Sequence, residues 1–243
     1  MKITKQLLIN NNPSTLIEDH IRLEMNTPGR CVLSMKSTSE PLRGQLLEIN
    51  GKLSQSDLRR LFYGYIETVT PKQNGVYKIV GRELAAILNQ RIALNLRHVT
   101  PNKVLEAISF QTKTRFILPK SEWTNKTIAR FQHIGGGYMA LDNILKLWNV
   151  QRGFWHQQAD GQIFIGECAK SVPGQKKINI PASIFSAISV QGGTLPLLPR
   201  LRPGVQIEMA GQVFYINSID IEGENMRLNW LINPWETTLK AIQ

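Results

Sequence analysis

The sequence predicts a mainly β protein in which an α+β segment separates two β-rich segments. Three observations lead to this prediction. Alternating polar and apolar residues recur in short runs between residues 20 and 80, and again after residue 201. Between these stretches, from Gly81 onward, apolar residues fall at helical spacing. The chain has 243 residues, which allows one large β-rich unit or two to three small domains.

The first β-rich segment contains at least five predicted strands joined by short turns. These strands are 20–25, 31–36, 45–49, 61–69 and 76–80. The first turn is predicted at Asn26-Thr27-Pro28-Gly29, Asn50-Gly51 is expected to end the third strand in a tight turn, and residues 71–75 join the last two strands. Gly64 interrupts its run and indicates a bulge or a close backbone approach. Strands at this spacing favour a small barrel or sandwich, because closure removes exposed edges.

The middle segment combines helices with strands. A short helix is predicted after Gly81, and a second begins at Thr100-Pro101, where Thr caps the helix and Pro takes its first position. Strands are predicted at 115–119 and 128–134, followed by a helix that ends near Trp148. Two further strands flank the turn at Asp160-Gly161, a strong hairpin signal.

The last segment returns to strands. Residues 171–177 are polar and contain Pro and Gly, so we expect a linker there. Gly204, Gly211 and Gly223 then mark the turns around three alternating runs, 205–209, 213–221 and 225–231. This pattern predicts a β-meander.

The net charge of +11 is the one unusual property of the composition. The 29 Lys and Arg residues are spread along the chain, and nothing is denser than Arg59-Arg60 or Lys176-Lys177. A dedicated DNA-binding tail or helix concentrates such charge. We therefore interpret most of it as a solvated basic surface.

The sequence predicts a chain made and kept in the cytoplasm. It has no run of the roughly 20 apolar residues that a membrane helix needs, and its first residues lack the apolar core of a signal peptide. Cys31 and Cys168 lie far apart, with no second cysteine or histidine at metal spacing beside them. We expect two reduced, buried thiols.

No catalytic, cofactor-binding or metal-ligating residue is predicted. The four histidines do not share the spacing of a metal site; they are His20, His98, His133 and His156. No serine lies in a Gly-x-Ser-x-Gly turn, and neither cysteine has the setting of a nucleophile. The glycines at 135–137 match neither nucleotide-binding pattern, so a tight strand-to-helix turn is expected. No spacing rule tests whether Glu67 and Glu83 meet as a carboxylate pair.

Aromatic side chains on neighbouring strands raise an alternative, a nucleic-acid-binding protein built on oligonucleotide-type barrels. Tyr63, Tyr65 and Tyr77 lie near Arg59-Arg60, and bases stack on such side chains. Alternation places Phe62 on one face and Tyr63 and Tyr65 on the other, so we favour a core face and a packed interface. An enzyme, such as a cell-wall hydrolase, is the third hypothesis and has the least support.

A series of short motifs occurs in a definite order. It comprises Phe62, Gly64 and Ile66, then Gly81-Arg82-Glu83, Thr100-Pro101, the 141–148 helix, Trp155, Asp160-Gly161 and Leu201-Arg202-Pro203-Gly204. This order resembles the phage tail baseplate hub family, which includes the late control protein D group and the Mu-like 43-kDa tail proteins, and which is related to type VI secretion spike-hub domains. In that family an F-x-G-x-I/V pattern ends a strand, and G-R-D/E opens a helix after the next turn.

The resemblance implies a non-enzymatic late protein of a phage or prophage. It implies two tube-like β-barrel domains, 1–92 with a closing helix and 169–243, separated by an α+β domain, 93–168. A homotrimer of such subunits forms a ring that connects the tail tube to the central spike at the virion baseplate, after assembly in the bacterial host cytoplasm.

The partners implied by the resemblance are copies of the chain itself, the central spike protein, the tail tube or distal tail protein and, as a further candidate, the tape measure protein. DNA is met only in transit through the ring, so we expect the positive charge to lie outside the channel. No cofactor and no membrane segment are implied.

Overall fold

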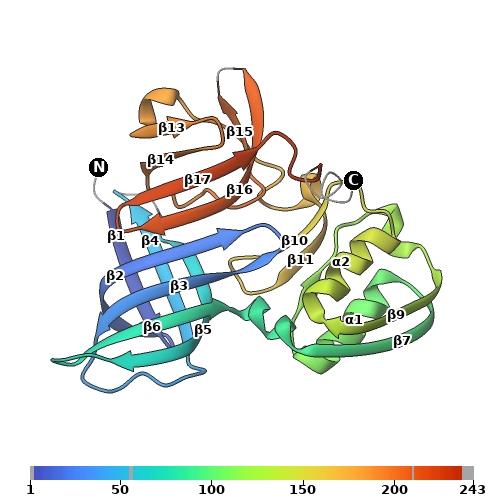
Figure 1. The fold of residues 1–243 in the computed structure, drawn as a ribbon, viewed down its shortest axis with the longest axis horizontal. Coiled ribbons are helices and arrows are strands. Elements are labelled where there is room, and N and C mark those ends of the chain that lie inside the picture. The colour runs from blue at the N-terminus through green and yellow to red at the C-terminus, as the bar shows by residue number, and fades with distance from the viewer. Residues whose placement is uncertain (1–2, 55–56, 210, 237–243) are drawn as a thin grey trace.

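The first six strands form a closed β-barrel (Figure 1). The computed structural model describes residues 3–54, 57–209 and 211–236. The barrel strands are β1 (Ile3–Ile9), β2 (Asn12–Glu24), β3 (Thr27–Lys36), β4 (Leu46–Leu53), β5 (Arg59–Pro71) and β6 (Val76–Glu83). They pair antiparallel in the order β1-β4-β5-β6-β3-β2, and β1 also pairs with the start of β2. This last pairing closes the barrel and leaves neither strand with a free edge there.

Alternating side chains of the strands fill the barrel interior. In β5, Phe62 and Ile66 are 1% and 0% exposed, whereas Tyr63 and Tyr65 are half-buried on the opposite face. The predicted facing of these aromatics is confirmed. Burial of a side chain such as Phe62 stabilises the fold by roughly 1.5–3 kcal/mol.

Asn50-Gly51 does not form the predicted turn. Both residues lie inside β4, opposite Gln6 and Lys5 of β1, and the register with β5 shifts beside them. A Cβ added to Gly51 would lie 2.7 Å from Leu61 Cδ1, so the glycine allows close packing across the barrel. The prediction was wrong because the same dipeptide also suits a bulge within a strand.

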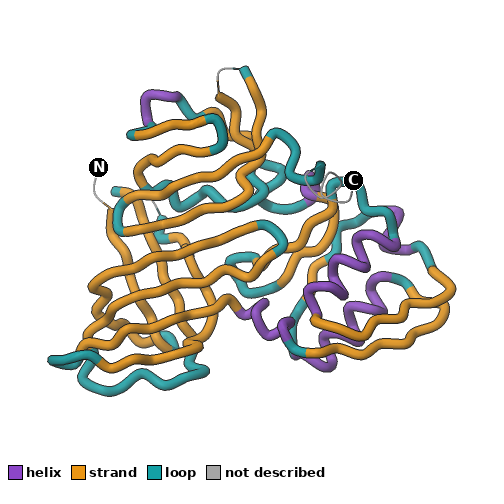
Figure 2. The backbone as a smooth tube through the Cα atoms, viewed as in Figure 1, coloured by secondary structure: helices purple, strands orange, loops and turns teal. Residues whose placement is uncertain are grey.

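The middle of the chain forms an α+β unit beside the barrel, and most of the helical residues gather there (Figure 2). Its elements are η1 (Leu84–Asn89), β7 (Arg91–Val99), α1 (Pro101–Thr112), β8 (Phe116–Ile117), η2 (Glu122–Asn125), β9 (Ile128–Gly136), α2 (Gly137–Leu147), β10 (Gly153–Gln157) and β11 (Ile163–Glu167). Strands β7 and β9 pair with each other, and β10, β11 and β8 form a second small sheet. The helices α1 and α2 pack with both sheets around one apolar core.

The predictions for this unit are largely confirmed. Helix α1 begins at Pro101 after Thr100, and the hairpin of β10 and β11 encloses Asp160-Gly161. The helix expected after Gly81 is a short 3-10 helix, η1. Strand β7 was not predicted. No helix in the described part of the chain is long and apolar enough to cross a membrane.

The remaining strands extend the barrel sheet. They follow η3 (Cys168–Lys170) and are β12 (Lys177–Asn179), β13 (Ala187–Ser189), β14 (Gly192–Pro196), β15 (Gln206–Met209), β16 (Gln212–Glu222) and β17 (Asn225–Leu231), with η4 (Ala182–Ile184) before β13. Strand β16 pairs antiparallel with the second half of β2, from Ser218 opposite Glu24 to Glu222 opposite His20. The result is one 12-stranded sheet with one continuous apolar core.

The mainly β fold with an α+β part is confirmed. The meander of β15, β16 and β17 is present, and both cysteines are free and buried. The domain boundaries at 92/93 and 168/169 stay a prediction. The large sheet joins the first and last predicted domains, because β2 pairs with β16.

Candidate functional site

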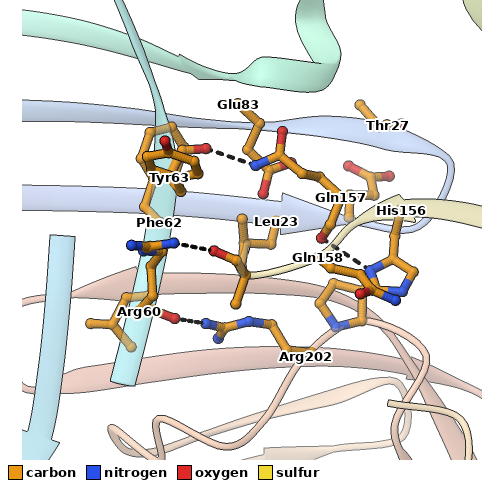
Figure 3. Close-up of a pocket in the computed structure, with 14 residues that line it drawn as sticks. Leu23, Thr27, Arg60, Phe62, Tyr63, Glu83, His156, Gln157, Gln158 and Arg202 are labelled. Atoms are coloured by element: carbon orange, nitrogen blue, oxygen red, sulfur yellow. Dashed lines mark hydrogen bonds between the residues drawn. The ribbon is translucent and has the colours of Figure 1, made fainter. Parts of the chain in front are cut away.

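Three parts of the chain meet at a small cavity lined by polar groups (Figure 3). Its walls come from the barrel, the β10–β11 hairpin and the loop that precedes β15. The cavity has a volume of about 30 Å³, which gives room for a water molecule. Four lining side chains, those of Glu83, His156, Gln157 and Arg202, are called the junction cluster below.

Glu83 is the last residue of β6 and lies under the start of β3. Its Oε2 atom accepts a hydrogen bond of 2.6 Å from the backbone N–H of Gly29. Burial raises the pKa of this carboxyl to about 7, although the Gly29 N–H and the positive charge of Arg202 both act to lower it. A Cβ on Gly29 would lie 2.8 Å from Glu83 Cδ, so glycine is required for this contact.

Gln157 joins the hairpin to the barrel through two hydrogen bonds, one buried and one partly buried. Its amide nitrogen donates to the carbonyl of Tyr63 at 2.7 Å, and its amide oxygen accepts from the backbone N–H of Ala85 at 2.8 Å. One side chain thus satisfies a main-chain donor in η1 and a main-chain acceptor in β5. Because Ala85 is buried and Tyr63 is half-buried, the loss of this side chain leaves a buried donor and a partly buried acceptor unpaired.

His156 and Arg202 complete the cluster. The ring of His156 stacks on Phe154, with centroids 5.1 Å apart, and its Nδ1 lies 3.1 Å from the carbonyl of Gln157. Burial, with a smaller contribution from Arg202, lowers the pKa of His156 to about 4, so the ring is neutral at physiological pH. Arg202 donates to the carbonyls of Leu201, at 2.9 Å, and of Arg60.

The motif residues of β5 and β6 explain why these strands approach so closely at the cluster. Gly64 pairs with Glu83, and a Cβ on Gly64 would lie 1.9 Å from the carbonyl oxygen of Arg82. Gly81 pairs with Ile66, and its Cβ would lie 2.7 Å from Cys31 Sγ. Glycine at both positions lets the barrel wall pack tightly beside the junction.

The two carboxylates considered as a pair have different surroundings. Glu67 forms an ion pair of 3.1 Å with Arg82 near the surface, whereas Glu83 is buried against Gly29. Arg82 and Glu83 are successive residues of one strand, so their side chains point to opposite faces. The structure therefore does not bring Glu67 and Glu83 together as an acid and base.

One of the four histidines lies in the barrel and three lie in the α+β unit. His20 lies 3.6 Å from Asp220, at the pairing of β2 with β16, and His98 is exposed on β7. His133 bonds to the carbonyl of Gly136 at 3.1 Å. Within the described ranges, no group of three or more His, Cys, Asp or Glu side chains is placed to hold a metal ion.

The glycines 135–137 form the predicted strand-to-helix turn. Gly135 and Gly136 end β9, and Gly137 opens α2. A Cβ on Gly137 would lie 2.7 Å from the carbonyl oxygen of Leu88 in η1, so packing explains this glycine.

The junction cluster holds three parts of one chain together. Its polar groups bond mainly to backbone atoms, and none of the four side chains is a nucleophile with an adjacent base. Sequence reasoning noted Arg202 only as a member of a motif, noted Glu83 as a motif residue and as half of a carboxylate pair with Glu67, and did not assign a role to Gln157. The hairpin signal at Asp160-Gly161 placed Gln157 in a strand, but it could not show which strand of the barrel this residue meets.

Comparison with known sequences gives one distant relative. No protein-family model matches the chain. An uncharacterized 58.7 kDa protein of Haemophilus phage HP1 is 27% identical over 207 residues, which cover 85% of this chain and 38% of that protein. The chain thus spans well under half the length of this relative.

Comparison with solved structures identifies the fold. The 43 kDa tail protein of prophage MuSo2 from Shewanella oneidensis superposes with a TM-score of 0.73 and 11% identity, covering 95% of this chain and 97% of that one. The chain shares the fold of this prophage tail protein. The Escherichia coli c3393 protein also matches, with a TM-score of 0.66, 14% identity and coverage of 93% and 76%. It is a type VI secretion component with structural similarity to the phage T4 tail proteins gp27 and gp5.

Proposed function

We propose that this chain is a non-enzymatic structural protein of a phage-type tail, a baseplate hub subunit whose trimeric ring connects the tail tube to the central spike. The observation that carries the proposal is the shared fold over 95% of this chain and 97% of the MuSo2 tail protein. The motif order found in the sequence supports it independently. The proposed partners are copies of the chain, the spike, and the tail tube or distal tail protein, with the tape measure protein as a further candidate, while DNA only passes through.

The arrangement of strands suits a ring of three subunits. Each subunit contributes the β1–β6 barrel and the strand group from β12 to β17, joined side by side through β2 and β16. Three copies therefore present six β units around an axis, which lets a threefold spike meet a sixfold tube. A head-to-tail contact that closes after three copies generates such a ring.

An exposed sheet edge offers a subunit contact. Strand β13 ends the pairing path of the large sheet, and all three of its residues are exposed. Ile188 and Val190 are 55% and 89% exposed beside this edge. Unpaired main-chain groups next to apolar side chains favour the addition of a strand from a neighbouring molecule.

The test is the solution mass of the purified chain over a concentration series, measured by light scattering. A species near three times 27.5 kDa is expected, because the ring holds three copies. Ile188→Lys places a charge on the β13 edge and is expected to shift the chain toward the monomer. Met139→Lys is the matched control, because Met139 is 60% exposed on α2, away from that edge. Equal masses for both variants would count against an interface at β13.

A further inference from the structure

A second, larger pocket lies next to the junction cavity and is strongly basic. It has a volume of about 460 Å³. Four segments line it: residues 58–60 at the start of β5, 156–160 in the β10–β11 hairpin, 172–176 before β12, and 199–202 before β15. The fold thus brings Arg59-Arg60 and Lys176, members of the two densest basic pairs of the sequence, to one hollow.

The positive charge in this pocket is not balanced by the residues that line it. Five cations line the pocket, namely Arg59, Arg60, Lys176, Arg200 and Arg202, against one carboxylate, Asp160. Asp160 bonds to Gln162, at 3.0 Å to its backbone N–H and 2.8 Å to its side chain. Arg60 pairs with Glu48 at 2.6 Å. The other four cations form no ion pair with any carboxylate of the described chain.

The arginines are held in place rather than left to extend into solvent. Arg60 donates to the carbonyl of Ala159 at 2.7 Å, and Arg202 donates to the carbonyl of Arg60. Both arginines also line the neighbouring junction cavity, where Figure 3 shows them, and their hydrogen bonds connect the walls of the basic pocket. Burial and the nearby charge of Arg59 lower the pKa of Arg202 to about 10, with Glu83 acting in the opposite direction. Like charges fixed at close range create a positive potential that an anion relieves.

Other groups in and beside the pocket also indicate that it suits an anion. Lys177 pairs with Glu208 at 2.7 Å, whereas Lys176, the next residue, lines the pocket and forms no ion pair with the residues that the structure describes. Two buried nitrogen atoms of lining residues, Arg60 Nε and His156 Nε2, also have no hydrogen-bond partner among the residues that the structure describes. The pocket wall therefore contains polar atoms without hydrogen-bond partners as well as cations without ion-pair partners, among the described residues.

The shape and lining of the pocket favour a peptide over nucleic acid. The cations converge in one hollow, whereas proteins that bind nucleic-acid backbones usually spread them along a stripe or groove. Apolar side chains share the lining; these are Leu58, Val172, Pro173 and Pro199. The volume falls within the roughly 300–1,000 Å³ of ordinary ligand pockets. We propose that this basic pocket binds a short acidic peptide segment that carries an apolar side chain, supplied by another protein.

The proposal names the chemistry of a partner and rests on the proposed tail function only for the source of that partner. The test therefore uses the isolated full-length chain and a fluorescein-labelled peptide of glutamate interrupted by leucine. The same peptide with glutamine in place of glutamate, and a labelled single-stranded DNA oligonucleotide, are measured beside it by fluorescence anisotropy. Light scattering on the same samples reports ring formation separately, so either hypothesis can fail alone.

The variant pair keeps the change of net charge equal. Lys176→Glu with Arg200→Glu reverses two exposed cations of the pocket. Arg97→Glu with Lys103→Glu reverses two exposed cations on β7 and α1, outside the pocket. None of the four residues belongs to the buried core, so both double variants are expected to fold.

We expect the glutamate peptide to bind saturably to the native chain. Its affinity is expected to fall at least tenfold in the pocket variant and at most about twofold in the control variant. The glutamine peptide is expected to bind at least tenfold more weakly than the glutamate peptide. No binding of the glutamate peptide at low salt would overturn the proposal, and so would an equal loss in both variants. Binding of the DNA without the peptide would also overturn it and would assign the pocket to phosphate.

Discussion

Glu83→Gln tests whether the junction cluster carries a buried, titrating carboxyl. Glutamine keeps the size of the side chain and an oxygen that can accept the hydrogen bond from Gly29, which is 2.6 Å long in the native chain. It removes the proton equilibrium. The comparison of the two proteins therefore isolates the effect of ionisation from the effect of packing.

The magnitude follows from the pKa of Glu83. Burial raises it from 4.5 to about 7, so the folded state binds the proton more tightly than the unfolded state. The stabilisation that this provides is complete below the unfolded pKa and is lost as the pH rises through the folded pKa. Between about pH 5 and about pH 8, the native chain should lose roughly 2–3 kcal/mol of unfolding free energy relative to Glu83→Gln.

The assay is urea unfolding of both proteins at these two pH values, followed by tryptophan fluorescence. The lowered pKa of His156 destabilises both proteins in acid, so its contribution cancels in the difference. Glu40→Gln is the control, because Glu40 is exposed and lies outside the junction. Its free energy of unfolding should follow that of the native chain at both pH values.

A difference between the native chain and Glu83→Gln that does not change with pH would refute the reasoning. So would a change of the opposite sign, in which the native chain gains stability relative to the variant as the pH rises. The first result would mean that Arg202 and the Gly29 N–H offset the effect of burial on the pKa of Glu83, and the second that they outweigh it.

Two further substitutions test how the junction is built. Gln157→Ala leaves the N–H of Ala85 and the carbonyl of Tyr63 unpaired. It should lower the free energy of unfolding, measured in urea, by about 2–4 kcal/mol. A decrease below about 0.5 kcal/mol would show that the contact between hairpin and barrel does not depend on Gln157. Gly64→Ala places a Cβ 1.9 Å from the carbonyl oxygen of Arg82 and should lower the unfolding temperature strongly or prevent folding. Its control, Gly136→Ala, meets nothing within 4 Å at a negative φ and should be nearly neutral.

Much of the fold could be predicted because its signals are local. The run that became β5 carries the alternation of a strand with one buried face, and Thr100-Pro101 carries the start of a helix. Asn50-Gly51 misled the prediction because a turn, a bulge and a tight packing site all select the same residues. Strand β1 was missed although Asn10 and Asn11, both at positive φ, form the turn that joins it to β2. Two adjacent asparagines are a weaker turn signal than Asn-Gly.

The junction cluster and the basic pocket could not be predicted, because both depend on contacts between distant parts of the chain. Gln157 bonds to Tyr63, 94 residues away, and Arg202 bonds to Arg60, 142 residues away. Spacing along the sequence carries no information about such pairs. The even distribution of Lys and Arg likewise concealed that the fold gathers five of them around one hollow.

The most direct test of the proposed hub is negative-stain imaging of the main species formed by the native chain across a concentration series. The account predicts a ring of three subunits around a central hole, with six β units along its circumference. A monomer or a twofold dimer at every concentration would contradict the claim that this chain forms the ring.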